Sequence, residues 1–337
     1  MKHKIVIVGA GPAGLRCAKI LAENYEDFLV LEKSEEIGRK ICTGIWVLNE
    51  RTKSMNIPEE VFEKKFRKVI FTTPYKKVEV ELEEPFVASI NRKKLSEWMY
   101  REIKKYKAEV LFGYNVSKVG SDYVIANNKK IYFDYLVGAD GSNSVVRKSL
   151  GLSTEFGIGI QYWLEEKFED IEIHYDAEAF GAWYSWVVPH KQVTSIGAGC
   201  DPKVIPIKKL KENLDKWCEE KGIKIKDTTF ESALISYKYY GYGFDDKFLI
   251  GDAAGLASSL NGEGIYFAMA SGEDVGRIIV EKNYKPKLIE EVLNLKKKHD
   301  LIANFLKSSK TLEKISYNLL LHFLKSKFFV RKALNFV

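Results

Sequence analysis

A glycine-rich turn and a later acid have the types and spacing of a dinucleotide-binding site. Gly9-Ala10-Gly11-Pro12-Ala13-Gly14 follows an apolar run and begins a helical pattern. Glycines placed this way permit a tight turn and let the backbone and a helix N-terminus approach a pyrophosphate. Glu32 ends the next apolar run, 18 residues after Gly14, where it can accept from a ribose hydroxyl. An acid there favours FAD or NAD over NADP, and the fingerprint alone leaves FAD and NAD open, as well as a glycine turn of another α/β protein.

Two later stretches repeat the pattern of an apolar strand followed by a glycine and an acidic residue. Tyr135–Gly151 reads YLVGADGSNSVVRKSLG and carries Asp140, and Phe248–Gly255 reads FLIGDAAG and carries Asp252. Each stretch taken singly is compatible with an ordinary strand and turn. The second is followed by Asn261-Gly262-Glu263-Gly264-Ile265, a bare turn that opens a helical pattern. Small residues around Asp252 would leave room for a bound cofactor.

In this order and spacing the three motifs resemble FAD-dependent enzymes of the p-hydroxybenzoate hydroxylase fold. The resemblance covers about residues 1–280 and implies FAD as the cofactor. It implies that the first motif holds the pyrophosphate and that Asp252 holds the ribityl hydroxyls. The turn at Gly262–Ile265 would then offer N–H groups to the flavin edge where negative charge develops on reduction. No second GxGxxG opens a helix pattern, so we expect no separate nicotinamide domain.

Within that fold the chain resembles the geranylgeranyl reductase family. The motifs are Cys42-x-Gly44, Tyr184-x-Trp186 before Pro189, and the late Gly-Asp-Ala-Ala-Gly…Gly-Glu-Gly-Ile. Members of that family saturate isolated double bonds of isoprenoid chains on prenyl diphosphates, archaeal membrane lipids or chlorophyll precursors. The chain departs from the family in its short C-terminal region after Lys285 and in Val188, where the family has Phe.

The resemblance implies catalytic roles for Cys42, Tyr184 and Trp186 and no metal site. The cofactor contacts that it implies are Gly9, Gly11, Ala13, Gly14, Glu32, Lys33, Cys42, Gly44, Arg92, Val116, Asp140, Asp252, Gly262, Gly264 and Ile265.

The bland interpretation of several residues stays open. Cys42 can be a small core residue, a gate or redox sensor beside the flavin, or a proton donor, although a neutral thiol is a poor acid toward an alkene. Tyr184 and Trp186 can be sheet core, or can line an apolar slot whose ring faces attract positive charge. Two rival functions are a flavin-dependent monooxygenase or halogenase, and a non-catalytic FAD-binding or lipid-binding protein. The electron donor, NAD(P)H or ferredoxin, is also open.

The elements that would position these residues form an α/β fold. A strand at 4–8, a helix at about 12–24 and a strand at 28–32 predict a parallel βαβ unit, with further helices at about 91–107, 207–221 and 262–281 and a helical tail. We expect an FAD-binding domain at 1–66, 91–155 and 241–282. It is interleaved with a mainly antiparallel substrate domain at 67–90 and 156–240, and residues 283–337 form a short helical C-terminal region.

Composition narrows the class of protein. The 337 residues are 46% hydrophobic and 29% charged, as in an ordinary globular protein, and no apolar run is long enough to span a bilayer. The N-terminal apolar run is too short for a secretory signal, so we expect a cytoplasmic protein, and its four cysteines are expected to be reduced thiols. High Lys, Glu, Ile and Tyr contents with two glutamines hint at a thermophile, and an archaeal source fits the family.

The basic residues leave two interpretations open. The net charge is +7, with the densest patches at 296–298 and 307–310. The patches can be a solvated helix face, or they can attract anionic lipid head groups or a phosphorylated substrate. Nucleic acid is not expected, because no nucleic-acid-binding motif accompanies the charge. Likewise, the C-terminal run can close the core or lie on a membrane surface.

Overall fold

The first layer of the fold is a mixed eight-stranded sheet. The structure, a computed structural model, describes residues 2–38, 42–106, 108–153 and 155–336. Five parallel strands have the order β18-β11-β1-β2-β8. Of the three antiparallel strands, β17 pairs with β18, and β10 pairs with the first part of β11 and with β9. Their bounds are β1 Lys2–Val8, β2 Phe28–Leu31, β8 Glu109–Leu111, β9 Val116–Val119, β10 Tyr123–Ala126, β11 Lys129–Gly138, β17 Gly243–Phe244 and β18 Lys247–Leu249.

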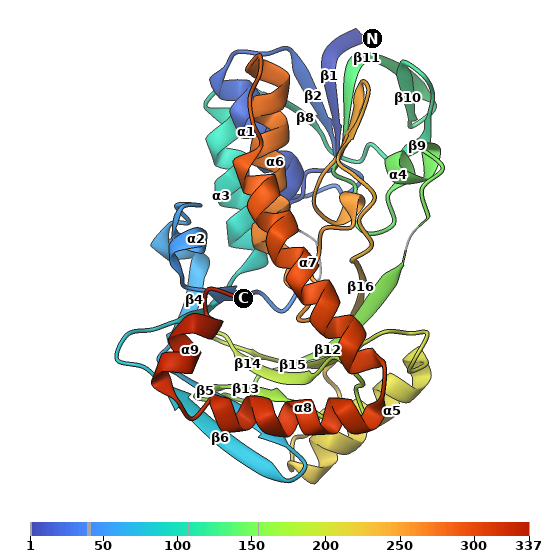
Figure 1. Ribbon diagram of the computed structural model, residues 1–337. Coiled ribbons are helices and arrows are strands. Elements are labelled where there is room, and N and C mark those ends of the chain that lie inside the picture. The colour runs from blue at the N-terminus through green and yellow to red at the C-terminus, as the bar shows by residue number, and fades with distance from the viewer. Residues whose placement is uncertain (1, 39–41, 107, 154, 337) are drawn as a thin grey trace.

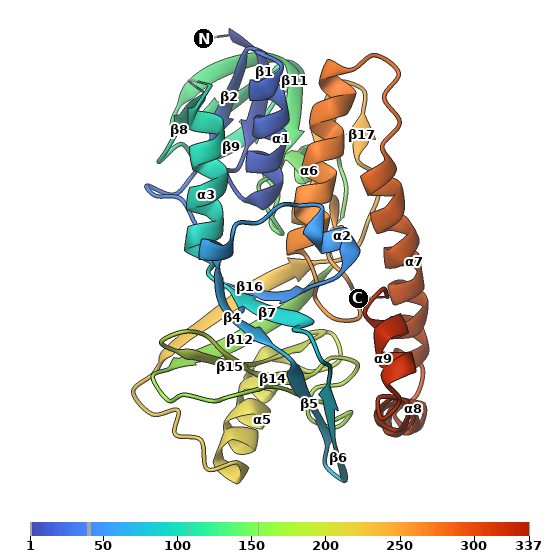
Figure 2. The ribbon, with the colours of Figure 1, turned by 90° about the vertical axis from the view of Figure 1, so that its left-hand side faces the viewer.

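Three helices pack beside this sheet: α1 (Pro12–Glu23), α3 (Arg92–Lys104) and α6 (Ile265–Val280) (Figures 1 and 2). The helices α1 and α6 lie very close, because a Cβ at Gly272 would overlap the backbone of Ala13. An ion pair of 2.5 Å between Arg16 and Glu273 joins their flanks. Two segments from opposite ends of the chain are thereby fixed against each other.

The second layer is a seven-stranded sheet with the order β16-β12-β15-β14-β13-β5-β6. All its neighbours are antiparallel except β13 and β5. The helix α5 (Ile207–Glu220) buries Leu210 and Leu214 in the same apolar cluster as this sheet. The strand bounds are β5 Lys68–Thr73, β6 Lys76–Glu81, β12 Phe156–Leu164, β13 Ile171–His174, β14 Ser185–Pro189, β15 Thr194–Cys200 and β16 Thr229–Ser236.

A small three-stranded sheet lies between the two layers (Figure 2). It has the order β3-β7-β4, with bounds Ile45–Val47, Val87–Ile90 and Phe62–Phe66. Short elements connect the rest: α2 (Glu50–Lys53), the 3₁₀ turns η1 (Glu59–Val61) and η2 (Gly251–Ala254), and α4 (Val145–Ser149).

The chain ends in three helices, α7 (Lys287–Lys307), α8 (Lys310–Phe323) and α9 (Lys327–Ala333), which lie toward the viewer in Figure 1 and along the right-hand side in Figure 2. Leu321 and Val330 enter a second apolar cluster of the seven-stranded layer, separate from the one that contains Leu210 and Leu214 of α5. The last turn is tied back to α2, because Asn49 Nδ2 donates to the carbonyl oxygen of Leu334 at 2.8 Å. Within the described ranges, the helices are too short or too polar to cross a membrane.

The predicted fold class is confirmed, including the helical C-terminal region. The helix predicted at 262–281 begins at Ile265, and η2 occupies the turn after β18. Residues 87–90, expected with the antiparallel lobe, pair with β3 and β4 in the small sheet. The domain boundaries stay a prediction.

Candidate functional site

The first glycine motif forms a bare cradle at the end of β1. Gly9 has a φ of +104°, and a Cβ there would overlap the carbonyl oxygen of Ala139. A Cβ at Gly14 would overlap the carbonyl oxygen of Gly9, so this glycine lets α1 approach the strand. Gly11 differs, because a Cβ there would meet no atom within 4 Å in the described part of the chain. Gly11 therefore faces open space at the N-terminus of α1, where a pyrophosphate fits.

Glu32 is held at the end of β2 by backbone amides. Its carboxylate accepts from Ala10 N at 2.8 Å and from Ser34 N at 2.9 Å. The Glu32 carbonyl oxygen accepts from Tyr114 N at 2.8 Å, which brings the start of β9 and its Val116 toward this corner. Lys33 is exposed. A fixed carboxylate beside the glycine cradle is the geometry expected for a ribose partner.

Asp252 lies where the late motif meets the first one. Ser142 Oγ donates to Asp252 Oδ2 at 3.0 Å. Gly251 has a φ of +57°, and a Cβ there would lie 3.1 Å from the Ala13 Cβ, so the late turn is seated on the first turn of α1. A Cβ at Gly264 would lie 3.4 Å from Asp252 Oδ1. The structure therefore brings both motifs together, although they are far apart in sequence.

Asp140 serves the neighbouring helix. Its Oδ2 accepts from Val145 N at 2.7 Å and Val146 N at 3.3 Å, at the start of α4. Burial raises the pKa of Asp140, and its Oδ1 is buried without a hydrogen-bond partner among the described residues. The buried Arg147 on α4 donates to Ser236 Oγ at 3.1 Å. This motif braces the junction of the two layers, and contact of Asp140 with a cofactor stays a prediction.

Arg92 offers the clearest test of whether an anionic cofactor fits. It begins α3, next to the Asn91 side chain that caps the helix. Its Nε and Nη1 atoms are buried and have no hydrogen-bond partner among the residues that the structure describes. Buried guanidinium donors without partners are costly, so such a group calls for an acceptor that binds there. FAD supplies phosphate, hydroxyl and carbonyl oxygens, and the residues present fit it.

The loop that carries Cys42 and Gly44 is fastened between the layers. Gly44 has a φ of +79°, and a Cβ there would overlap the Ile90 carbonyl oxygen. Thr43 Oγ1 donates to Gln161 Oε1 at 2.8 Å, and His190 Nε2 lies 2.9 Å from the Thr43 carbonyl oxygen. The loop therefore faces the second, seven-stranded layer. Residues 39–41, just before this loop, lie outside the described residues.

Tyr184 connects the second layer to the glycine turn at Gly262–Ile265. Its hydroxyl donates to the Asn261 carbonyl oxygen at 2.6 Å, one residue before Gly262. Burial raises the pKa of Tyr184 above its usual range, and the nearby ionisable side chains of Tyr175, Glu263 and Cys42 make smaller contributions to this shift. The Tyr184 hydroxyl thus contacts the residue that precedes the Gly262–Ile265 turn, and the Glu263 and Cys42 side chains lie near enough to it to affect its pKa.

Trp186 is placed differently from Tyr184. Its Nε1 donates to Ser195 Oγ at 3.1 Å, and its ring covers Gly197, where a Cβ would collide with it. The ring is 9% exposed and belongs to the second layer's apolar cluster. Its edge-to-face contact with Tyr184, at 6.1 Å between centroids, makes it a support for that ring.

Glu263 is a further ionisable group of this site, and no motif in the sequence predicts its role. Burial raises the pKa of Glu263 to about 7, although the charge of Arg51 acts in the opposite direction. Its Oε2 is buried and has no hydrogen-bond partner in the described part of the chain. The available signal was an acid between two glycines at a turn that otherwise has no charge. A carboxyl with this pKa can hold a proton near neutral pH.

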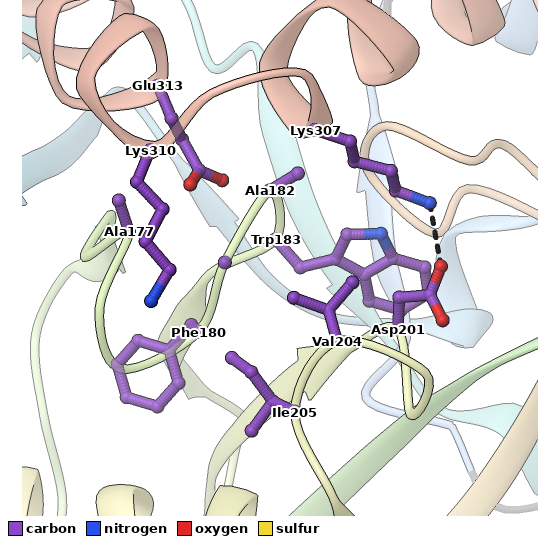
Figure 3. Close-up of a pocket in the computed structure, with 11 residues that line it drawn as sticks. Ala177, Phe180, Ala182, Trp183, Asp201, Val204, Ile205, Lys307, Lys310 and Glu313 are labelled. Atoms are coloured by element: carbon purple, nitrogen blue, oxygen red, sulfur yellow. Dashed lines mark hydrogen bonds and ion pairs between the residues drawn. The ribbon is translucent and has the colours of Figure 1, made fainter.

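Two hollows adjoin this region. A cavity of about 160 Å³ lies beside Trp183, between the apolar Phe180 and Ile205, and its rim carries the Lys307–Asp201 ion pair of 2.8 Å (Figure 3). An open groove of about 870 Å³ begins at Trp46, two residues after Gly44, and continues along Phe62 and Phe86. Ligand sites commonly occupy about 300–1,000 Å³, so only the groove has room for a long chain. No group of three His, Cys, Asp or Glu side chains among the described residues could hold a metal ion.

Comparison with known proteins agrees with the cofactor that these residues fit. A family model described as an FAD binding domain matches residues 2–282. The geranylgeranyl diphosphate reductase of Rhodobacter capsulatus is 27% identical over 295 residues, covering 81% of this chain and 73% of that protein. The digeranylgeranylglycerophospholipid reductase of Methanocaldococcus jannaschii is 25% identical over 354 residues, covering 93% and 88%. The predicted FAD cofactor is confirmed, and the chain is a distant homologue of geranylgeranyl reductases.

Solved structures show the same fold at lower identity. A geranylgeranyl bacteriochlorophyll reductase-like protein from Thermoplasma acidophilum superimposes with a TM-score of 0.81 at 18% identity, covering 98% of this chain and 95% of that one. The p-nitrophenol 4-monooxygenase of Pseudomonas putida superimposes with a TM-score of 0.77 at 14% identity, covering 99% and 97%. Because a reductase-like protein and a monooxygenase both match, the fold by itself does not choose the reaction.

Proposed function

The chain belongs to the FAD binding domain family, and we propose that it is an FAD-dependent reductase of isolated carbon–carbon double bonds. The substrate that we propose is an isoprenoid (geranylgeranyl) chain on a prenyl diphosphate or an archaeal-type lipid. The names of two distant relatives, one acting on a diphosphate and one on a glycerophospholipid, support this class.

The observation that carries the proposal is the hydrogen bond from Tyr184 to Asn261. It joins the aromatic wall of the substrate lobe to the glycine turn that would face the flavin. Cys42 and Glu263 lie within interaction distance of the same hydroxyl. An aromatic face, a thiol and a buried acid therefore surround the point where a substrate would meet the cofactor.

The residues that would hold FAD follow from the geometry. Glu32 would accept from a ribose hydroxyl, the amides after Gly11 would bind the pyrophosphate, and Asp252 would hold the ribityl chain. Arg92 would donate its unused N–H groups to an acceptor of the same molecule. When bound and reduced, FAD supplies the hydride that an alkene needs at one carbon.

The proton for the other carbon would come from Glu263. Its buried Oε2 can carry that proton near pH 7, whereas a neutral thiol at Cys42 is the weaker acid toward an alkene. The Tyr184 ring would stabilise positive charge that develops on the substrate during protonation. The chain's role is thus to hold a proton in a dry site until the double bond arrives.

The groove beyond Gly44 would receive the isoprenoid chain. Its walls include Trp46, Phe62 and Phe86, and Phe86 shares an apolar cluster with Tyr184. Apolar side chains exclude water and match a hydrocarbon tail. The groove is also lined by Lys53, Lys65 and Arg331 and by the acidic Glu50, Glu83 and Glu84, and Lys65 already pairs with Glu59 at 2.6 Å. We propose Arg331 as the partner of an anionic head group.

The test is anaerobic. The FAD-loaded protein is reduced with dithionite, mixed with geranylgeranyl diphosphate or an unsaturated archaeal-type ether lipid, and the lipid is analysed by mass spectrometry. A gain of about two mass units per reduced bond is the result expected for addition of a hydride and a proton. Absence of any gain on these substrates would contradict the proposal.

Two further measurements separate the rival functions. Substrate-dependent oxygen consumption with NADH or NADPH would indicate a monooxygenase or halogenase. Bound flavin that no prenyl substrate reoxidises would indicate an FAD-binding or lipid-binding protein without catalysis. Replacing dithionite by NAD(P)H or by reduced ferredoxin identifies the external electron donor.

A further inference from the structure

The outer side of the three C-terminal helices exposes large apolar side chains. On α8, Ile315, Leu319 and Phe323 recur at helical spacing and are 50%, 51% and 50% exposed. On α9, Phe328 is 69% exposed. We call the whole set the outer ridge; its members are Leu301, Ile302, Phe305, Leu312, Ile315, Leu319, Phe323 and Phe328.

These side chains are not needed to fix the helices on the molecule. On α8, the buried Glu313, Tyr317 and Leu321 recur every four residues and form the opposite stripe. Tyr317 donates to the Gly181 carbonyl oxygen at 2.8 Å, and Leu321 enters the apolar cluster of the second layer. Figure 2 shows α7, α8 and α9 along one side of the molecule, and in Figure 1 they lie toward the viewer. The ridge residues are therefore apolar side chains that the packing of these helices on the core leaves exposed.

The chain from the middle of α7 onward carries its positive charge. Residues 296–337 contain ten lysine and arginine residues and two acidic ones, a formal net charge of +8, whereas the whole chain has +7. The basic residues are spread along the sequence, as expected, but the acidic residues are almost absent from this end. Some of its lysines pair internally, such as Lys310 and Lys314 with Glu178. Six others lie exposed: Lys297, Lys298, Lys325, Lys327, Arg331 and Lys332.

We propose that the outer ridge docks on the surface of an anionic phospholipid bilayer. Exposed apolar side chains interleaved with Lys and Arg are typical of helices that lie in the interfacial plane of a membrane. Each basic residue near an anionic surface adds attraction that salt weakens. A second copy is the less suitable occupant, because a two-fold contact would place two segments of +8 against each other. This inference does not depend on the reductase activity.

Vesicle flotation tests the proposal on the full FAD-loaded chain. Vesicles of phosphatidylcholine with about one third phosphatidylglycerol are compared with vesicles of phosphatidylcholine alone. We expect flotation with the anionic vesicles at low salt, and loss of most of it when the salt is raised to about 0.5 M. The readout uses no substrate, so an inactive protein that floats would contradict the proposed function and leave this inference standing.

Matched variants locate the contact. Leu319→Glu should lower the vesicle partition coefficient at least tenfold. The change removes an apolar side chain that would be buried in the lipid on docking, and it adds a negative charge that an anionic lipid surface repels. Ile207→Glu on α5 is the control, since Ile207 is also 50% exposed on a helix. Lys297→Glu/Lys298→Glu is likewise compared with Lys208→Glu/Lys209→Glu, two adjacent exposed lysines of α5. Retention of bound FAD shows that each variant is folded.

Three results would overturn the proposal. One is flotation that is equal on neutral and anionic vesicles, and another is equal loss in the α5 controls. The third is a protein that stays in solution with both vesicles. If that protein also forms a dimer by light scattering that Leu319→Glu dissociates, the occupant of the ridge is a second copy.

Discussion

The Tyr184 hydroxyl donates a 2.6 Å hydrogen bond to the carbonyl oxygen of Asn261, 77 positions later in the chain. This bond links the aromatic residues of the antiparallel layer directly to the loop that leads into the glycine turn at the start of α6, and the neighbouring Trp183 Nε1 donates to the Ser259 carbonyl oxygen of the same loop at 3.0 Å. The reaction that we propose depends on both sides of it, so its loss should affect substrate turnover more than cofactor binding.

Tyr184→Phe should lower kcat/KM for a prenyl substrate about tenfold. Without the hydrogen bond to the Asn261 carbonyl oxygen, neither the aromatic ring nor the glycine turn is held in position. FAD affinity should stay within about twofold. The control is Tyr162→Phe, which removes another 2.6 Å hydrogen bond, to Asp215, on the same sheet. Equal losses of activity in the two variants, measured by anaerobic turnover, would assign Tyr184 a role in stability only.

Arg92→Met should have opposite effects on the apoprotein and on the FAD complex. Removing a guanidinium whose Nε and Nη1 atoms are buried without hydrogen-bond partners among the described residues should raise the apoprotein's free energy of unfolding by about 1–3 kcal/mol. FAD affinity should fall about tenfold or more, because charge-assisted hydrogen bonds are lost. Urea unfolding and flavin fluorescence titration measure the two quantities. Lys93→Met, at the exposed next position, should change neither; a destabilised Arg92→Met apoprotein would contradict the prediction.

Gly11→Ala and Gly14→Ala should separate binding from folding. A Cβ at position 11 meets no described atom of the chain within 4 Å, so the apoprotein should keep its stability and lose FAD affinity at least tenfold. A Cβ at position 14 would overlap the Gly9 carbonyl oxygen, so that variant should unfold at a lower temperature before any cofactor is added. Thermal unfolding and FAD titration of both variants make the comparison. Similar behaviour of the two would refute the assignment of open space at Gly11.

Glu263→Gln should lower anaerobic turnover about a hundredfold at pH 6, because Gln has no acidic proton to give. The wild-type rate should fall as the pH rises through about 7, where Glu263 loses its proton. Glu313→Gln is the control, because burial also raises the pKa of Glu313 to about 7, but this carboxyl lies on α8. Loss of the pH dependence in the control, or its persistence in Glu263→Gln, would remove Glu263 from the mechanism.

The same two carboxyls should make stability depend on pH. In the unfolded chain each ionises near its usual pKa of 4.5, whereas in the folded chain each keeps its proton up to about 7. The folded state then binds more protons, so the free energy of unfolding should fall between about pH 4.5 and 7, by about 3 kcal/mol per carboxyl. Urea unfolding at pH 5 and pH 8 measures the difference. Glu263→Gln/Glu313→Gln should reduce it, and an unchanged difference would contradict these assignments.

The parts of the fold that local sequence determines were predictable. The strand, glycine turn and helix of residues 2–23 need only apolar periodicity and a bare turn, so their positions were predicted within a few residues. The pairing of β3 with β7 was not predictable, because Ile45–Val47 meets Val87–Ile90 only through long-range packing.

The site divides in the same way. The glycines and Glu32 could be predicted from their spacing in the sequence. The chemistry of Glu263 and Arg92 depends on the burial of their polar atoms, which no local sequence pattern predicts. Acidic residues in turns are normally solvated and ionised. Burial at the start of α6 raises the pKa of Glu263, so that it can keep its proton near neutral pH. Trp186 shows the converse, because its motif left sheet core and slot lining both open, and only the folded structure shows that it is mostly enclosed in the sheet.

The close seating of α6 on α1 also dictates when the cofactor can be captured during synthesis. Arg16 and its partner Glu273 are separated by 257 positions, so the first half of the cradle leaves the ribosome long before the second exists. At ordinary elongation rates that delay is on the order of tens of seconds. Until α6 has emerged and folded back, the nascent N-terminus has no complete pocket, and a chaperone or its own neighbouring strands must shield its apolar face. Loading of the flavin is therefore a late, near post-translational event, and truncated chains that end before residue 251 should remain colourless.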